Sequence, residues 1–164
     1  MRNPTARRIQ LATITGTALL AVTALTACGS NAAAATMPSS QEIAALFDQW
    51  NTALQGDPEG VAELYAENGV LLPTLSPVVR TNREEIKEYF EKDFLPKKPS
   101  GTITESHVLV IDENSAAHSG NYTFTVNGKD GARTKVPARF TYVYEKIDGK
   151  WLITEHHSSA VPAS

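Results

Sequence analysis

The segment "ARTKVPARFTYVYEKIDGKWLITEHHSS", residues 132–159, decides the fold of this chain. Two runs rich in β-branched and aromatic residues flank Asp148-Gly149, a dipeptide typical of the tight turn in a β-hairpin. Alternation along the first run places Phe140, Tyr142 and Tyr144 on one face. The segment therefore predicts two long antiparallel strands that present an aromatic face.

Two similar runs precede this hairpin in the sequence. They are "TITESHVLVI", residues 102–111, and "AAHSGNYTFTV", residues 116–126, and the turn-forming stretches "DENS" and "NGKDG" separate the runs. Short strands at this spacing with tight turns between them are typical of an antiparallel meander. The second half of the chain is therefore expected to form a four-stranded sheet.

The residues before the meander predict helices. Ser39 with Glu42 has the spacing of a capping box, and one apolar stripe at helical spacing follows it, consisting of Ile43, Leu46, Phe47, Trp50 and Leu54. Asp57-Pro58 predicts the start of a second, short helix, since proline suits the first helical position.

A short strand and a third helix complete the expected elements. The run "VLLPTL", residues 70–75, predicts a strand that Pro73 confines to a sheet edge or a bulge. Thr81 with Glu84 predicts the cap of the third helix, whose apolar face carries Ile86, Tyr89, Phe90 and Phe94. Helices followed by a meander favour an α+β fold in which helices pack on a strongly curved antiparallel sheet. A pocket is expected between helix and sheet.

The N-terminal residues predict export. Three arginines, an uncharged apolar run and small residues form the layout of a signal peptide over residues 1–27. Leu25-Thr26-Ala27-Cys28 resembles the bacterial lipobox, which implies lipidation of Cys28, a flexible tether over residues 28–38 and a domain over residues 39–162. The chain is then expected to be extracytoplasmic and held at the cell membrane by this lipid alone. A permanent membrane-spanning anchor and a plain secreted protein are the competing interpretations.

The charge of the chain argues against a nucleic-acid partner. Without the three arginines of residues 1–27, twelve basic and eighteen acidic side chains remain, a formal charge of −6. Nucleic-acid binding requires a basic surface, which this composition does not favour.

The polar cluster His156-His157-Ser158-Ser159 at the end of the last strand is the candidate site. Alternation groups His156 and Ser158 with Leu152 and Thr154, and it groups His157 and Ser159 with Trp151 and Ile153. One His-x-Ser pair is therefore expected in the pocket unless a bulge intervenes, and His156 with Ser158 is our choice. Histidine suits proton transfer near neutral pH, and a serine hydroxyl can orient a water molecule.

Other interpretations of this cluster stay open. A serine hydrolase is disfavoured, because no carboxylate is placed to orient the histidine and no nucleophile-elbow pattern is present. A metal site would need His107 or His118 as a further ligand, since adjacent histidines on a strand point in opposite directions. The cluster could also be a polar strand end without chemistry. Further polar candidates are Thr74, Tyr89 and Arg139. The simpler interpretation of Arg139 is a solvated strand residue.

The stretches "LYAENGVLLPTLSPVVRTNREEIKEYF" and "DGKWLITEHHSSAVP" resemble the nuclear transport factor 2-like superfamily. Within it, residues 39–162 are similar to the calcium/calmodulin-dependent kinase II association-domain group and its SnoaL-like, SgcJ/EcaC-type bacterial relatives. The resemblance implies a cone-like, cystatin-like fold and a homodimer or larger ring. Kinase association domains line their pocket with arginines, but Tyr142 and Ser158 stand at two of the matching positions here, so a carboxylate-gripping pocket is not expected.

The closing "HHSSAVP" also resembles iota-class carbonic anhydrases. This resemblance implies reversible hydration of CO2 to bicarbonate. Catalysis would fall to His156, Ser158, Tyr89 and Thr74, with His157, Ser159, Tyr142 and Arg139 as second choices. The resemblance is compatible with a metal-using or a metal-free site. Because the sequence lacks a convincing set of three histidines, a metal-free site without a cofactor is favoured, and zinc or manganese is the alternative. A non-catalytic module for small-ligand binding or oligomerisation is the alternative function.

Overall fold

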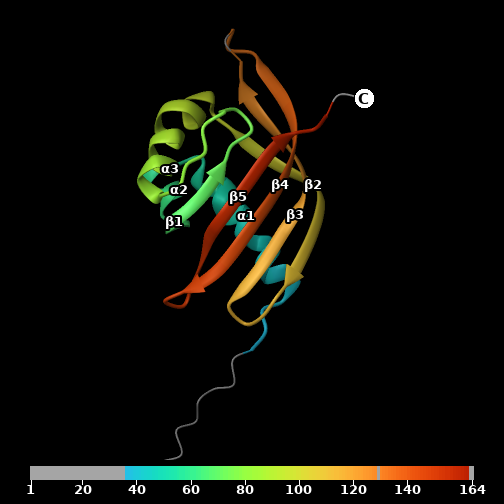
Figure 1. Cartoon of the computed structure of the whole chain (residues 1–164). Helices are drawn as coiled ribbons and strands as arrows, with labels where there is room; N and C mark the ends of the chain where they lie inside the picture. The colour runs from blue at the N-terminus through green and yellow to red at the C-terminus, as the bar shows by residue number, and fades with distance from the viewer. Residues whose placement is uncertain (1–35, 129, 163–164) are drawn as a thin grey trace, which may run out of the picture. The chain divides into compact units, whose positions relative to one another are not determined.

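The computed structural model describes residues 36–128 and 130–162 (Figure 1). The predicted signal peptide, Cys28 and most of the predicted tether lie outside the described residues. The elements are α1 (Ser40–Ala53), α2 (Pro58–Ala62), β1 (Tyr65–Leu72), α3 (Arg83–Tyr89), the π-helical turn η1 (Phe90–Phe94), the 3-10 turn η2 (Leu95–Lys97), β2 (Ser100–Val110), β3 (Ser115–Asn127), β4 (Arg133–Ile147) and β5 (Lys150–Ala160). Among these elements, no helix is both long and apolar enough to cross a bilayer.

The strands form one five-stranded sheet in the order β1-β5-β4-β3-β2. Strands β2 to β5 make the predicted antiparallel meander. Strand β1 extends this meander by pairing with β5 in parallel, an orientation that was not predicted from the sequence. Strand β1 also starts at Tyr65, five residues earlier than predicted, and its register shifts between Tyr65 and Val70. Pro73 follows directly after this edge strand, where its missing N–H costs no sheet hydrogen bond.

Helix α1 lies against one face of the sheet (Figure 1). Its start is the predicted one, since the Ser39 hydroxyl accepts a hydrogen bond from the Glu42 amide at 3.1 Å. Phe47 and Trp50 are buried on this helix, and the Phe47 ring packs against Phe140 and Tyr142 of β4. The apolar stripe of α1 and the aromatic face of the hairpin thus pack together within the core.

Helix α3 begins one residue later than predicted. Asn82, not Thr81, is the N-cap, and its side chain accepts from the Glu85 amide at 2.9 Å. Glu85, not Glu84, reaches back to the Thr81 amide. The sequence Thr81-Asn82 offers two adjacent candidate caps, because asparagine caps a helix at least as well as threonine.

A bulge on β5 changes which residues of this strand face the core. Glu155 pairs with Val143, but Ile153 pairs with the next residue, Tyr144, so Thr154 is an extra residue in the ladder. One extra residue reverses the alternation. Ile153 therefore shares the buried face with His156, and the predicted grouping of His156 with Leu152 and Thr154 was wrong.

A second irregularity bends β2 where it passes Gly120 of β3. The register of β2 shifts between Ile103 and Glu105, and a Cβ atom on Gly120 would lie 1.9 Å from the Glu105 carbonyl oxygen. Only glycine allows the two backbones to approach this closely. The sheet therefore curves around the inner, helix-covered face.

Candidate functional site

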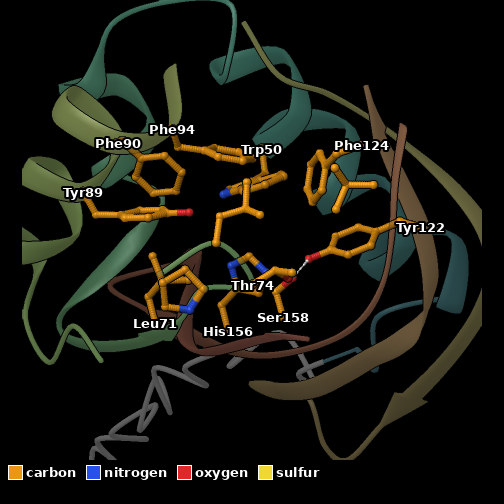
Figure 2. Close-up of a pocket in the computed structure, with 13 residues that line it drawn as sticks. Trp50, Leu71, Thr74, Tyr89, Phe90, Phe94, Tyr122, Phe124, His156 and Ser158 are labelled. Carbon is orange, nitrogen blue, oxygen red and sulfur yellow. Dashed lines mark hydrogen bonds between the residues drawn. The ribbon is translucent and has the colours of Figure 1, made fainter. Parts of the chain in front are cut away.

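A cavity lies between the helices and the inner face of the sheet (Figure 2). Its empty volume is about 360 Å³ including the part open to solvent, but the centre of a water-sized molecule can occupy only about 20 Å³ of it. This is little more than one water molecule requires. The lining is Trp50, Leu71, Pro73, Thr74, Leu75, Tyr89, Phe90, Phe94, Tyr122, Phe124, Val136, His156 and Ser158. The cavity as it stands therefore fits a ligand of a few atoms.

Three hydroxyl groups meet on one side of this cavity. The Tyr122 hydroxyl donates to Ser158 Oγ (Figure 2), and Ser158 Oγ also shares a hydrogen bond with Thr74 Oγ1. Burial raises the pKa of Tyr122, so its hydroxyl keeps its proton and remains a donor. The Tyr89 hydroxyl points toward the centre of the cavity (Figure 2), and burial raises its pKa as well.

His156 lines the same cavity from β5 and is almost fully buried. Its Nδ1 lies 2.8 Å from the Tyr65 hydroxyl, which accepts a hydrogen bond from Trp50 Nε1 at 3.0 Å. The ring stacks on Tyr142 with 4.0 Å between centroids. Burial, with a smaller contribution from His157, lowers the pKa of His156 to about 3. The imidazole is therefore neutral near neutral pH.

The structure brings the four first-choice residues of the sequence analysis to one cavity. Thr74 follows β1, Tyr89 ends α3, and His156 and Ser158 lie on β5. No observation tests whether they act in catalysis, so that role stays a prediction. Alternation splits the polar cluster as expected, because the Thr154 bulge lies before it.

The second-choice residues lie elsewhere. His157, Ser159 and Arg139 line a shallow concavity that includes Glu105 and His107, and His157 and Arg139 are exposed on the face of the sheet away from α1. Tyr142 is fully buried under His156 and does not line the cavity, and its hydroxyl has no hydrogen-bond partner among the described residues. These positions are therefore not part of the cavity.

The histidines considered as metal ligands do not converge. His118 Nε2 lies 2.8 Å from Ser106 Oγ, and His107 pairs with Glu105 at 2.9 Å. Within residues 36–128 and 130–162, no group of three or more histidine, cysteine or acidic side chains is placed to hold one ion.

Three residues of the site were not predicted from the sequence, namely Tyr122, Tyr65 and Trp50. Tyr122 could have been found by alternation, since Tyr122 and Phe124 both face inward on β3. Only the place of Tyr65 at the start of β1 brings its hydroxyl to His156. Trp50 has the pattern of an ordinary core residue, and only the tertiary structure gives its indole N–H a polar partner.

The curved sheet with helices on one face is the nuclear transport factor 2-like, cystatin-like fold. A nuclear transport factor 2-like protein of Streptomyces avermitilis superposes with a TM-score of 0.67 at 17% identity, covering 75% of this chain and 97% of that one. At this identity the likeness concerns the fold alone.

The chain belongs to the family of calcium/calmodulin-dependent protein kinase II association domains, whose model matches residues 39–162. A Xanthomonas campestris structure whose description names such a domain is 55% identical, with a TM-score of 0.74 over 77% of this chain and 91% of that one. The association domain of the Caenorhabditis elegans kinase is 16% identical, with a TM-score of 0.58 over 73% and 94% of the two chains. No curated protein matches the chain.

The buried neutral His156 makes stability depend on pH. In the unfolded chain its pKa returns to about 6.5, so below that pH the unfolded state takes up a proton that the folded state excludes. Stability is present above pH 6.5 and is lost as pH falls toward 3. At pH 4.5 the expected loss from this residue is about 2–3 kcal/mol.

Denaturant unfolding of the wild type and of His156→Gln, at pH 7 and pH 4.5, measures this contribution. Glutamine is polar and does not titrate, and His118 remains in both proteins. The wild type should therefore lose about 2–3 kcal/mol more than the variant on acidification. Equal losses in both proteins would contradict the buried neutral state of His156.

Proposed function

We propose that this domain binds a small oxygen-containing ligand in its inner cavity and assembles with copies of itself. The observation that carries the proposal is a set of uncharged hydrogen-bond donors gathered in a small, apolar cavity. Such a cavity suits a molecule that is mostly apolar but carries oxygen acceptors. The lining residues include no acid, lysine or arginine, so a strongly charged ligand would have no counter-ion there.

The donors can be counted from the hydrogen bonds. Ser158 Oγ accepts from Tyr122, and one proton joins Ser158 to Thr74, so one hydroxyl proton of that pair stays available. The Tyr89 hydroxyl adds another donor toward the cavity. His156 Nε2 is buried without a hydrogen-bond partner in the part of the chain that the structure describes. Because unpaired buried polar groups are costly, a ligand with acceptor oxygens would relieve this cost.

Hydration of CO2 is the catalytic form of this proposal. The water oxygen bonds to the carbon of CO2 and one proton leaves, which yields bicarbonate and H⁺. The donors would stabilise the negative charge that develops on the CO2 oxygens, and the hydroxyls of Thr74 and Ser158 would position the water and pass its proton toward solvent. With a pKa of about 3, His156 serves this scheme better as a hydrogen-bond donor than as the proton relay that its residue type suggested.

Ser158→Ala and Ser159→Ala make a matched pair for testing turnover. Both remove one hydroxyl from β5, but only Ser158 lines the cavity. Ser158→Ala should lower the rate of CO2 hydration by the purified domain roughly 10²-fold, as the loss of one positioned donor does. Ser159→Ala should keep the wild-type rate.

The same assay separates the catalytic form from the binding form. No hydration by the wild type, with or without added zinc or manganese, would exclude the enzyme and leave the binding module, which bicarbonate titration by NMR would then test. Activity abolished by a chelator would contradict the metal-free mechanism. Equal rates in Ser158→Ala and the wild type would remove Ser158 from it.

Assembly is the second part of the proposal. It is supported by membership in a family named for association, and by a Caenorhabditis elegans relative described as the association domain of its kinase. Light scattering on residues 36–164 should give the mass of a dimer or a larger ring. A monomeric mass at micromolar concentration would contradict it.

Export and lipidation remain part of the proposal, supported by the layout of residues 1–28. The full-length protein, expressed in a bacterium that processes lipoproteins, should fractionate with the membrane. Cys28→Ser should appear in the soluble extracytoplasmic fraction, because it removes the thiol that carries the lipid. A variant that still fractionates with the membrane would indicate an uncleaved spanning anchor.

A further inference from the structure

The hydrogen bonds around His156 determine which ring nitrogen carries its proton. Trp50 Nε1–H can only donate, and it donates to the Tyr65 hydroxyl oxygen at 3.0 Å. Among the described residues, the other group within hydrogen-bond distance of that hydroxyl is His156 Nδ1, at 2.8 Å. Tyr65 is fully buried, so its proton has one acceptor available, which is Nδ1.

The two neutral tautomers of His156 therefore differ in how many polar groups they leave unpaired. With the proton on Nε2, Tyr65 donates to Nδ1 and only Nε2–H lacks a partner. With the proton on Nδ1, the ring would donate to Tyr65, and both the Tyr65 proton and the Nε2 lone pair would be buried unpaired. Because unpaired buried groups are unfavourable, the first arrangement is preferred.

We propose that Trp50 and Tyr65 are positioning residues that hold His156 as the Nε2–H tautomer, so that His156 presents a fixed hydrogen-bond donor to the ligand. Trp50 on α1 orients the Tyr65 hydroxyl on β1, and Tyr65 orients the proton of His156 on β5. The use of this donor by a ligand rests on the proposed function. The tautomer itself is a property of the ligand-free protein and can be measured without any ligand.

The structure offers a matched control for Tyr65. Tyr142 is also fully buried and stacks on the His156 ring with 4.0 Å between centroids, but its hydroxyl has no hydrogen-bond partner within residues 36–128 and 130–162. Tyr65→Phe removes the hydroxyl that bonds to Nδ1, and Tyr142→Phe removes one that bonds to nothing. Both variants keep the ring, so effects of packing alone should be similar.

The experiment is nitrogen-15 NMR of the histidine side chains, near neutral pH and without ligand. The His156 signals are identified by replacing the other three histidines one at a time. In the wild type and in Tyr142→Phe, Nδ1 should show the shift of an unprotonated, pyridine-type nitrogen and Nε2 that of a protonated one. In Tyr65→Phe both shifts should move toward each other, because neither nitrogen then has a partner that selects one tautomer.

Two results would overturn the inference. One is a protonated Nδ1 in the wild type, which needs no variant to observe. The other is a folded Tyr65→Phe, with wild-type circular dichroism, that keeps the wild-type His156 shifts. If the shifts behave as expected but neither CO2 nor bicarbonate affects the protein, the tautomer assignment stands and the proposed ligand fails.

Discussion

The buried hydrogen-bond chain from Trp50 through Tyr65 to His156 joins three parts of the fold that are far apart in the sequence. It connects α1, the edge strand β1 and the last strand β5. Each group in it is buried, so each must find its partner inside the protein or leave an unpaired polar atom. These hydrogen bonds thus oppose any sliding of β1 along β5 or of α1 across the sheet. They also hold the His156 ring at the wall of the cavity.

The composition of the cavity follows from this arrangement. Most of the lining side chains are aromatic or aliphatic, and the polar side-chain groups among them are hydroxyls, the Trp50 indole N–H and one neutral imidazole. Burial keeps the hydroxyl protons of Tyr89 and Tyr122 in place and keeps the imidazole of His156 uncharged. A pocket of this kind favours small ligands with acceptor oxygens, and it differs from a pocket that would grip a carboxylate with arginine. Such a cavity is compatible both with binding of CO2 and with its hydration. A measurement of the CO2 hydration rate therefore distinguishes the two.

Much of the architecture could be predicted from local patterns. The stripe from Ile43 to Leu54 predicts α1 because helical spacing gathers apolar residues on one side, and Asp148-Gly149 predicts the last hairpin. Long-range pairing could not be predicted in the same way. The parallel pairing of β1 with β5 depends on residues about 85 positions apart, and local propensity carries no information on that contact. The Thr154 bulge likewise depends on how β5 fits β4, so alternation counted from Trp151 misassigns the face of Ile153.

The candidate site shows the same division. The sequence by itself determined that the polar cluster of residues 156–159 splits into two His-x-Ser pairs, since successive strand residues point to opposite faces. Only the tertiary structure decided that His156 and Ser158 face the helices, because the face of a strand is set by what packs on it. Only the tertiary structure also placed Tyr122 beside Ser158 and Tyr65 beside His156. These partners come from other strands, and a hydrogen bond between strands depends on sheet register rather than on local sequence.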